Sequence, residues 1–330
     1  MSPPQRPPLA TVPLATVPLA AVPLAAVVVT YNRRAHLQAT IARLRAAGCD
    51  RIVAVDNGSA DGSRDWLAGQ ADAGLEPIFT DANLGGAGGF AAGLDHLRQE
   101  NWHGWTVLLD DDARPEPGAL AVFRAMDRDG IDGIAAAVRY PAGESHGKIC
   151  DMNRPLRNPF GLPLRRRGFR IPDSAYDKDA LQNIDMATFV GFFLSPRALK
   201  ASRGPDPRLF IYGDDLLFTL SLSQAGMRLV FAPQIRFEHD CQTLSGPQNI
   251  YRPPWKVYYH YRNAILLYRQ AAGWLFWPVL LARLPRWVRM GRHYGEGAPE
   301  FRRLFWRAIR DGISGRLDDP PENIPGPPRP

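Results

Sequence analysis

The chain has 330 residues, of which 45% are apolar and 22% charged; this is the composition of a globular protein with a substantial core and excludes general disorder. Its three cysteines, Cys49, Cys150 and Cys241, are far apart and form no CxxC pair, which argues against a disulfide framework or a cysteine zinc site and favours a reducing compartment. The net charge of +7 is concentrated in the segment 262–316, where eleven arginines face three acids, so one localised acidic partner is indicated.

Both ends of the chain are rich in proline. Residues 1–24 repeat the pattern PLATV or PLAAV, with a proline every fifth residue from Pro8 to Pro23. Proline at this density blocks both helix formation and strand pairing. We therefore predict disordered tails over residues 1–24 and 317–330, and no segment reads as a secretory signal.

Between residues 25 and 113 the chain alternates apolar runs with helical patterns. The apolar runs are typical of buried strands and end in polar residues: AAVVVTYN, RIVAVDNGS, LEPIFTDAN and WTVLLDDDA. The segments between them, AHLQATIARLRAAG, RDWLAGQA and GGFAAGLDHLRQE, have helical spacing. This alternation predicts an α/β fold with a mainly parallel sheet flanked by helices.

The second half of the chain predicts fewer and shorter elements. MATFVGFFLSPRAL reads as a strand followed by a short helix, and GDDLLFTLSLSQAG as a helix that ends at Gly226. MRLVFAP and IRFEHD read as two further strands. Beyond Pro247, aromatic residues and arginines interleave, which predicts a helical C-terminal region.

Polar residues follow each of the four predicted parallel strands. Thr30 ends the first, Asp56 the second, Asn83 follows the third and Asp110 ends the fourth. In open α/β sheets, ligands bind outside the carboxyl ends of the strands. We expect these side chains to converge on one edge of the sheet.

The triplet Asp110–Asp112 is the strongest chemical signal. Asp110 and Asp112 are two residues apart, so an extended chain projects both to the same side. Two carboxylates on one side suit a hard divalent ion that also binds the oxygens of a diphosphate. The alternative is a solvated acidic turn ahead of Pro115.

The stretch NLGGAGGFAAG admits three interpretations. Gly86, Gly88 and Ala91 satisfy the GxGxxG/A pattern of dinucleotide-binding folds, although that pattern normally follows the first strand and this stretch follows the third. The glycines could instead let the backbone approach another ligand closely, or form a tight structural turn.

Four stretches, taken in chain order, resemble the nucleotide-sugar-binding motifs of the family 2 inverting glycosyltransferases with the GT-A fold. They are VVVTYNR, VAVDNGSADGS, NLGGAGGFAAG and LLDDDA. RLFIYGDDLLFTLSLSQAGMRLVFAPQIRFEH resembles the acceptor-side half of the same family. The resemblance covers residues 25–245, and RLFIYGDD and YHYRN are most similar to the galactofuranosyltransferase branch, with rhamnosyltransferases close behind. It implies a GT-A domain over 25–245 and a basic aromatic helical region over 246–316.

The resemblance also implies roles for individual residues. Asp110, Asp112 and His239 would bind Mn²⁺ or Mg²⁺, Asp215 would be the catalytic base and Asp214 its neighbour. Asp56 would hydrogen-bond the nucleotide base, and Asp111 would face the donor sugar or ribose. The rest of the donor site would comprise Thr30, Tyr31, Arg33, Asn83, Gly86 and Gly88.

The chemistry of displacement at an anomeric carbon agrees with these roles, because it needs a base for the acceptor hydroxyl and a cation for the leaving diphosphate. Each assignment has a plainer alternative. Asp214 or Asp215 could only cap a helix, and His239 could be a surface histidine. The family often has a further acid two residues after the acidic pair, where this chain has Leu217. This departure puts the details of the acceptor pocket in doubt.

The basic, aromatic C-terminal region could contact a membrane. GWLFWPVLLARL is shorter than a membrane span, but with the arginines around it the segment fits a membrane interface. The alternative is a helical subdomain with solvated arginines. Lysines and a recognisable nucleic-acid module are absent from 262–316, so we expect no nucleic-acid partner. Arg165–Arg167 could serve an acidic acceptor or be solvated.

The sequence thus predicts a metal-dependent inverting glycosyltransferase that moves galactofuranose or rhamnose from a UDP- or dTDP-sugar to a lipid-linked or polysaccharide acceptor in cell-envelope glycan synthesis. The expected location is the cytoplasm, peripheral on the inner face of the plasma membrane. Two alternatives are an NAD(P)-dependent oxidoreductase that uses Gly86 and Gly88, and a non-catalytic membrane-docking protein of the same fold.

Overall fold

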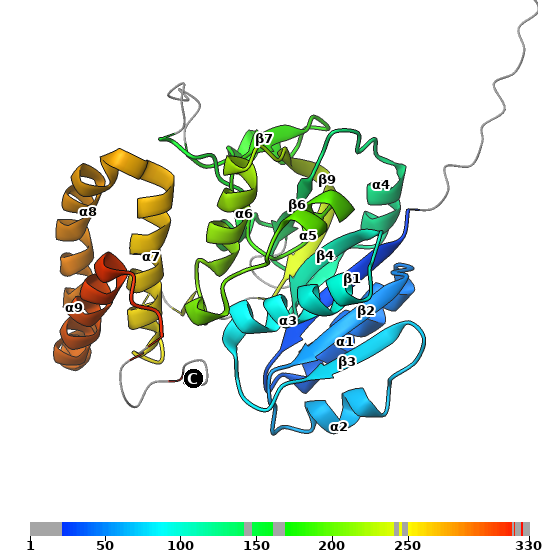
Figure 1. The fold of residues 1–330 in the computed structure, drawn as a ribbon, viewed down its shortest axis with the longest axis horizontal. Helices are drawn as coiled ribbons and strands as arrows, with labels where there is room; N and C mark the ends of the chain where they lie inside the picture. Colours follow the sequence, from blue (N-terminus) through cyan, green and yellow to red (C-terminus); the bar gives the residue numbers. More distant parts are fainter. Residues whose placement is uncertain are drawn as a thin grey trace, which may run out of the picture.

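The computed structural model describes residues 22–141, 147–160, 169–240, 244–245, 250–318, 320 and 325 (Figure 1). Residues 1–21 of the proline repeat, Arg165–Arg167 and most of the predicted tail over 317–330 lie outside these ranges, whereas Leu24, predicted as part of the tail, begins the first strand. Within them, a sheet covered by helices on both faces stands beside a layer of three C-terminal helices, α7 to α9 (Figure 1).

Nine strands form one mixed sheet in the order β3-β2-β1-β4-β8-β6-β9-β5, with β7 paired to β9. The strands are β1 (Leu24–Thr30), β2 (Arg51–Asp56), β3 (Leu75–Phe79), β4 (Trp105–Asp110), β5 (Ala113–Pro115), β6 (Gly133–Arg139), β7 (Gln182–Ile184), β8 (Phe192–Leu194) and β9 (Leu229–His239). A separate antiparallel pair is formed by β10 (Leu244–Ser245) and β11 (Ile250–Tyr251).

The first four strands are parallel neighbours, as the sequence predicts. All seven residues of β1 are buried, and alternate residues face opposite cores: Val28 packs with α1 (Arg34–Ala46) and Val27 with α3 (Gly85–Gln99). Burial on both faces explains the unbroken apolar run of this strand.

The second half of the sheet differs from the prediction in three ways. Strands β5, β7 and β8 pair antiparallel with their neighbours, so the sheet is mixed. The sequence analysis missed β6. The two strands predicted from MRLVFAP and IRFEHD are one long strand, β9, whose pairing with β6 shifts register between Ala136 and Ala137. The three residues at this bulge, Pro233–Ile235, produced the apparent break.

The helices cover the two faces of the sheet. The remaining ones in this part of the chain are α2 (Ser63–Ala68), α4 (Ala119–Ala125), α5 (Pro196–Ala201) and α6 (Asp214–Gln224), with short 3-10 turns η1 (Asp151–Asn153), η2 (Asp173–Ala175) and η3 (Pro207–Leu209). The helix α3 begins at Gly85, three residues before the predicted start at Gly88. Gly86 and Gly88 therefore lie in the first turn of a helix and not in a loop.

The C-terminal layer consists of α7 (Lys256–Ala272), η4 (Gly273–Leu275), α8 (Phe276–Met290), η5 (Gly291–Gly297) and α9 (Ala298–Ser314). Among the described residues, this continuous stretch is the one long and apolar enough to cross a membrane, by length and composition alone. Its helical path breaks at Gly273 and Gly295, where φ is 55°. Its helices have 17, 15 and 17 residues, and each is shorter than the roughly 20 residues of a span.

Candidate functional site

The carboxyl ends of β1, β2 and β4 bring together side chains that are far apart in the chain. Thr30 is the register partner of Asp56 on β2, and Val29 is the partner of Asp110 on β4. The predicted convergence of the strand ends is therefore present in the fold.

His239 reaches the same edge through antiparallel pairing. It is the last residue of β9 and pairs with Ala113 of β5, the residue directly after Asp112. A backbone hydrogen bond of 3.0 Å from the Asp240 N–H to the Asp112 carbonyl extends this contact. The short strand β5, which the sequence analysis did not predict as a separate strand, thus places a histidine beside an aspartate 127 positions away.

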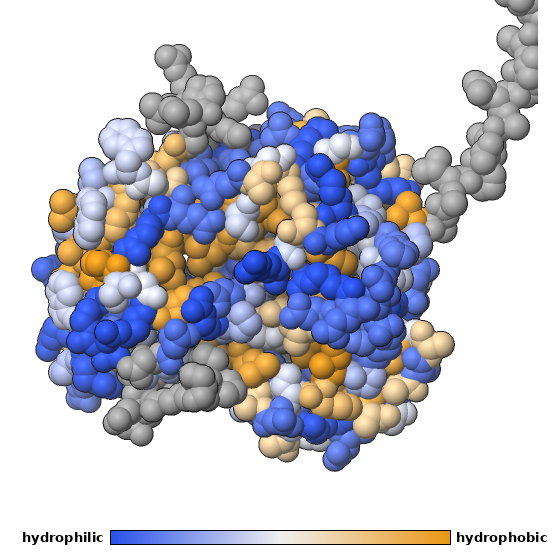
Figure 2. Space-filling view, in the orientation of Figure 1, coloured by the Kyte–Doolittle hydropathy of each residue, from blue (hydrophilic) through white to orange (hydrophobic). Residues whose placement is uncertain are grey.

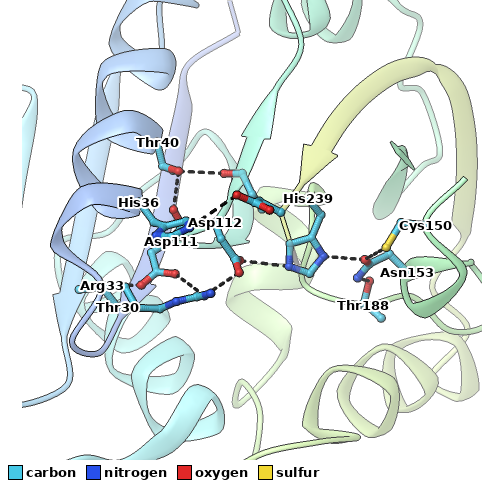
Figure 3. Close-up of polar contacts among 12 residues, drawn as sticks. Thr30, Arg33, His36, Thr40, Asp111, Asp112, Cys150, Asn153, Thr188 and His239 are labelled. Atoms are coloured by element: carbon cyan, nitrogen blue, oxygen red, sulfur yellow. Dashed lines mark hydrogen bonds and ion pairs between the residues drawn. The ribbon is translucent and has the colours of Figure 1, made fainter. Parts of the chain in front are cut away.

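Asp110, Asp112 and His239 form a cluster that could hold a metal ion, because one ligand atom of each lies within 4.8 Å of the others. The Nδ1 atom of His239 lies 2.8 Å from Asn153 Oδ1 (Figure 3). An amide oxygen can only accept, so Nδ1 carries a proton, and Nε2 presents its lone pair whenever the ring is neutral. That Nε2 lies 3.1 Å from Asp112 Oδ1, and two acceptors at this distance need a proton or a cation between them. The donor set therefore fits a divalent ion.

The charges of the cluster support the same conclusion. Burial raises the pKa of Asp110 to about 7, and the charge of Asp112 adds to this effect. Burial also disfavours ionisation of Asp112, but the hydrogen bond and charge of His239, together with Arg33, hold its pKa at about 2. One acid is thus ionised and the other is poised to lose its proton, so a cation would stabilise both as carboxylates.

Asp111 faces away from the cluster and is held by the first strand. Its Oδ2 accepts a 2.6 Å hydrogen bond from Thr30 Oγ1, and its Oδ1 lies 3.1 Å from Arg33 Nη1 (Figure 3). The same nitrogen of Arg33 lies 2.5 Å from Asp112 Oδ2. Thr40 of α1 donates to the Asp111 carbonyl at 2.6 Å. Arg33 therefore places a positive charge over both acids at the mouth of the site.

Asp56 is fully buried at the end of β2. Its Oδ1 accepts hydrogen bonds from the N–H groups of Gly58 and Ser59, at 3.0 and 2.8 Å. Its Oδ2 has no hydrogen-bond partner among the described residues. A buried carboxylate oxygen without a donor is costly, so a ligand N–H at this position would satisfy it.

The other predicted donor-site residues differ in their environment. Tyr31 is 43% exposed, and Asn83 uses Oδ1 to accept from the Gly85 N–H at 2.8 Å. A Cβ at Gly86 would meet no atom within 4 Å, whereas one at Gly88 would lie 2.4 Å from the Leu84 side chain.

Packing of α3 explains three glycines of this stretch that lie outside the GxGxxG/A pattern: Gly85, Gly89 and Gly93. A Cβ at Gly89 or Gly93 would lie 2.4 Å from Val29 or Val27 of β1. A Cβ at Gly85 would lie 2.1 Å from the carbonyl oxygen of Phe210. These three glycines let α3 and its first turn lie directly against neighbouring backbone and side chains.

Asp214 and Asp215 open α6 next to the cluster. Burial raises the pKa of Asp215 to about 6, against a 2.7 Å hydrogen bond from the Leu216 N–H to its Oδ1. Burial and the charge of Asp215 also raise the pKa of Asp214 well above its ordinary value. Asp214 also lines a cavity of 420 Å³ between α6 and α7. The N-cap residue of α6 is Gly213, so neither acid occupies the capping position.

Asn153 and Thr40 are the residues of the site that sequence reasoning missed. Asn153 lies in η1, donates from Nδ2 to Thr188 Oγ1 at 2.9 Å and accepts from His239. Nothing in the local pattern around either residue distinguishes it from a surface polar residue.

The chain matches known glycosyltransferases in sequence. The model of the family "Glycosyl transferase family 2" matches residues 25–192, just over half of the chain. Galactofuranosyltransferase GlfT1 of Mycobacterium tuberculosis (strain ATCC 25618 / H37Rv) is 29% identical over 298 residues, which cover 81% of this chain and 93% of the relative. GlfT1 of Mycolicibacterium smegmatis is 28% identical over 287 residues, covering 81% and 88%.

Solved structures show the same fold. Mannosyltransferase PcManGT from Pyrobaculum calidifontis, in complex with GDP-Man and Mn²⁺, has a TM-score of 0.51 and 14% identity over 91% of this chain and 88% of its own. GalNAc-T7 with UDP, GalNAc and Mn²⁺ has a TM-score of 0.54 and 14% identity over 76% of this chain, which spans about half (48%) of that structure. At this identity the similarity establishes the GT-A fold alone.

Proposed function

Because the chain belongs to glycosyl transferase family 2 and is thus a nucleotide-sugar glycosyltransferase, we propose that it moves galactofuranose from UDP-galactofuranose to a glycan acceptor with inversion at the anomeric carbon. The observation that carries this proposal is the Asp110–Asp112–His239 cluster at the carboxyl edge of the sheet, with the acidic pair of α6 beside it. The similarity to galactofuranosyltransferases over 81% of the chain supports the choice of sugar. Rhamnose from dTDP-rhamnose is the alternative.

Asp110, Asp112 and His239 would hold Mn²⁺ or Mg²⁺. When bound, the ion would supply positive charge for the diphosphate of the donor. Mn²⁺ is present with the nucleotide or nucleotide sugar in both structures of similar fold, which supports this cofactor. Asn153 would orient His239 because its Oδ1 accepts a hydrogen bond from the Nδ1–H group.

Asp215 would take the proton of the acceptor hydroxyl. As that proton moves to the carboxylate, the acceptor oxygen forms its bond to the anomeric carbon from one face, and the bond to the diphosphate oxygen breaks on the other. The electron pair of the broken bond leaves with the diphosphate, near the guanidinium of Arg33. Burial of Asp215 favours this role, because its raised pKa makes it a stronger base than an exposed aspartate.

The remaining residues would form the donor pocket. Asp56 Oδ2 would accept the imide N–H of uracil or thymine, which satisfies its buried oxygen. Asp111, held by Thr30 and Arg33, would face the ribose or the sugar. Tyr31, Asn83 and the first turn of α3, which contains Gly86 and Gly88, would line the rest.

The acceptor would be lipid-linked or polysaccharide in cell-envelope glycan synthesis, and the protein would act in the cytoplasm at the inner face of the plasma membrane. The exposed surface of η4, α8 and η5 supports this location. Trp274 and Leu281 are 87% and 67% exposed, and exposed arginines lie among them: Arg283, Arg286, Arg289 and Arg292. Apolar and strongly polar side chains alternate over the C-terminal layer (Figure 2). Such a mixture fits an anionic bilayer interface.

A thermal-shift panel of UDP, dTDP, GDP and NAD, each with Mn²⁺ or with EDTA, tests the donor site. A ligand at a hundred times its dissociation constant adds about 2.7 kcal/mol to stability, so we expect UDP with Mn²⁺ to raise the melting temperature and UDP with EDTA to have little effect. Stabilisation by NAD, or by UDP equally in EDTA, would contradict the proposal.

Transfer itself is measured with UDP-galactofuranose and dTDP-rhamnose on lipid-linked oligosaccharide acceptors. We expect product only from UDP-galactofuranose. Nucleotide binding without transfer of either sugar would instead indicate the non-catalytic, membrane-docking alternative.

A further inference from the structure

The backbone directly before the acidic pair is strained. Phe210 has φ 66° and ψ −70°, Tyr212 has φ 64°, and Gly213 has φ 76°. A non-glycine residue in such a region costs on the order of 1–3 kcal/mol and persists only where its surroundings hold it there. The segment 208–213, which we call the base loop, leads directly into Asp214 and Asp215 at the start of α6. Its shape therefore decides where the carboxylate of Asp215 lies.

Two neighbouring side chains of α7 hold the base loop by its carbonyl groups. Arg262 Nη2 donates to the carbonyls of Arg208 and Leu209, at 2.9 and 3.0 Å. Asn263 Nδ2 lies 3.0, 2.9 and 2.7 Å from the carbonyl oxygens of Leu209, Ile211 and Tyr212.

Arg262 is fully buried and Asn263 is 1% exposed. Burying a guanidinium is expensive unless all its donors are used. The ring faces of Tyr258 and Tyr259 lie 5.3 and 4.9 Å from its Cζ, and Nε donates to Asn263 Oδ1 at 2.9 Å. The two side chains thus support each other as well as the loop.

The first turn of α3 holds the base loop from the other side. The N–H of Ala87 donates to the Phe210 carbonyl at 3.1 Å, and the absent side chain of Gly85 makes room for that carbonyl. The base loop is therefore clamped between the glycine turn of the donor side and the C-terminal layer. Three sequence motifs, NLGGAGG, RLFIYGDD and YHYRN, meet at this point.

We propose that Arg262 and Asn263 are positioning residues for sugar transfer: by fixing the carbonyls of the base loop, they hold Asp215 where it can reach the acceptor hydroxyl. This inference depends on the role of Asp215 in the proposed function. It also gives the C-terminal layer a part in catalysis that is separate from any membrane contact.

The test compares Asn263→Ala and Arg262→Lys with Asp215→Asn, using kcat, KM and the pH profile of transfer from UDP-galactofuranose. We expect both α7 variants to lower kcat about 10- to 100-fold, as displaced supporting contacts do. The donor KM and the stabilisation by UDP with Mn²⁺ should stay unchanged, because the cluster lies on other elements. A loosened base loop exposes Asp215 to water, so the acid limb of the kcat profile should move to lower pH.

Asn158→Ala is the matched control, because it removes a 3.0 Å hydrogen bond to the carbonyl of Ala271 in α7 and none to Arg262, Asn263 or the base loop. Its kcat and pH profile should equal those of the wild type. Should Asn263→Ala fail to fold, Arg262→Lys, which keeps the charge, carries the test.

The possible failures are distinguishable. Wild-type kcat and pH profile in both α7 variants, together with an inactive Asp215→Asn, would overturn the positioning role and leave the proposed base intact. The positioning role would also be overturned if the loss of kcat were no larger than the loss of folded protein and kcat fell at the same acid pH as in the wild type. An active Asp215→Asn would instead remove the proposed base, and the positioning role with it.

Discussion

At the scale of single residues, the two neighbouring acids that open α6 both have a pKa above the ordinary range. Asp215 titrates at about pH 6 and Asp214 well above its ordinary range, because burial acts on both and the charge of Asp215 adds to the effect on Asp214. Coupled acids of this kind divide into one base and one neutral partner. The proposed roles of Asp215 and Asp214 follow from this difference.

The rate of transfer should therefore depend on the ionisation of Asp215. A base acts in its deprotonated form, so kcat should be constant above about pH 6 and fall about tenfold per pH unit below it. Asp215→Asn should lower kcat by about 10² to 10⁴ and abolish this limb. Asp214→Asn should keep the limb, since it leaves the carboxylate of Asp215 in place. A limb that survives in Asp215→Asn, measured by initial rates from pH 4.5 to 8, would contradict the assignment.

Asn153 should control metal affinity although it is not a predicted ligand. Without its amide oxygen, the ring of His239 loses the 2.8 Å hydrogen bond that fixes its tautomer. Calorimetric titration with Mn²⁺ in the presence of UDP should show about 10- to 100-fold weaker binding in Asn153→Ala. Asn153→Asp, which retains an acceptor, should bind Mn²⁺ as tightly as the wild type. Equal affinity in the alanine variant would mean that His239 is oriented by other contacts.

At the scale of elements, α3 lies so close to β1 that there is no room for a side chain at Gly89 or Gly93. The strand was predicted from its apolar run and the helix from its spacing, but the start of α3 was placed three residues late. Glycine has low helix propensity, so a sequence of four glycines reads as a loop. In the fold, Gly89 and Gly93 are selected by the contact with Val29 and Val27, and tertiary packing outweighs propensity.

Two alanine substitutions in this helix should have opposite effects on stability. Gly89→Ala places a Cβ 2.4 Å from Val29 Cγ1 and should lower the free energy of unfolding by about 1–3 kcal/mol. Gly86→Ala meets no atom within 4 Å and should raise it by up to about 1 kcal/mol through helix propensity. Urea denaturation measures both. Equal destabilisation by the two substitutions would show that the close packing is not the reason for the glycines.

At the scale of the whole molecule, the C-terminal layer has two different faces. Its inner face is an aromatic core that includes Tyr258, Tyr261 and Phe305 and packs against Phe210 of the base loop. Its outer face exposes Trp274, Trp277, Leu281 and Val288. The sequence analysis offered a packed subdomain and a membrane-binding segment as alternatives. The helices are packed, and the exposed face keeps the second prediction open to test.

Binding to vesicles that contain anionic lipid should depend on this outer face. Replacing Arg286, Arg289 and Arg292 with alanine should weaken sedimentation with such vesicles, and raised salt should weaken wild-type binding in the same way. Replacement of three exposed cations on the catalytic domain, Lys178, Lys200 and Arg203, is the charge-matched control and should have little effect. Equal loss in both triple variants would indicate nonspecific attraction, and no loss in either would exclude the α8 face.

The sequence by itself determined the local features: the four parallel strands, their covering helices, the acids at the strand ends and the family. These follow from patterns within about fifteen residues, because hydrophobic periodicity and polar strand ends are local properties. Only the tertiary structure decided which distant residues meet. Asp112 and His239 are 127 positions apart and Asn153 and His239 are 86 apart. Their contacts depend on β5, η1 and the antiparallel pairing of β9, which are too short or too irregular to leave a pattern. The clamp of Arg262 and Asn263 on the base loop likewise spans more than fifty positions, and buried hydrogen bonds of this kind arise from the packing of whole elements.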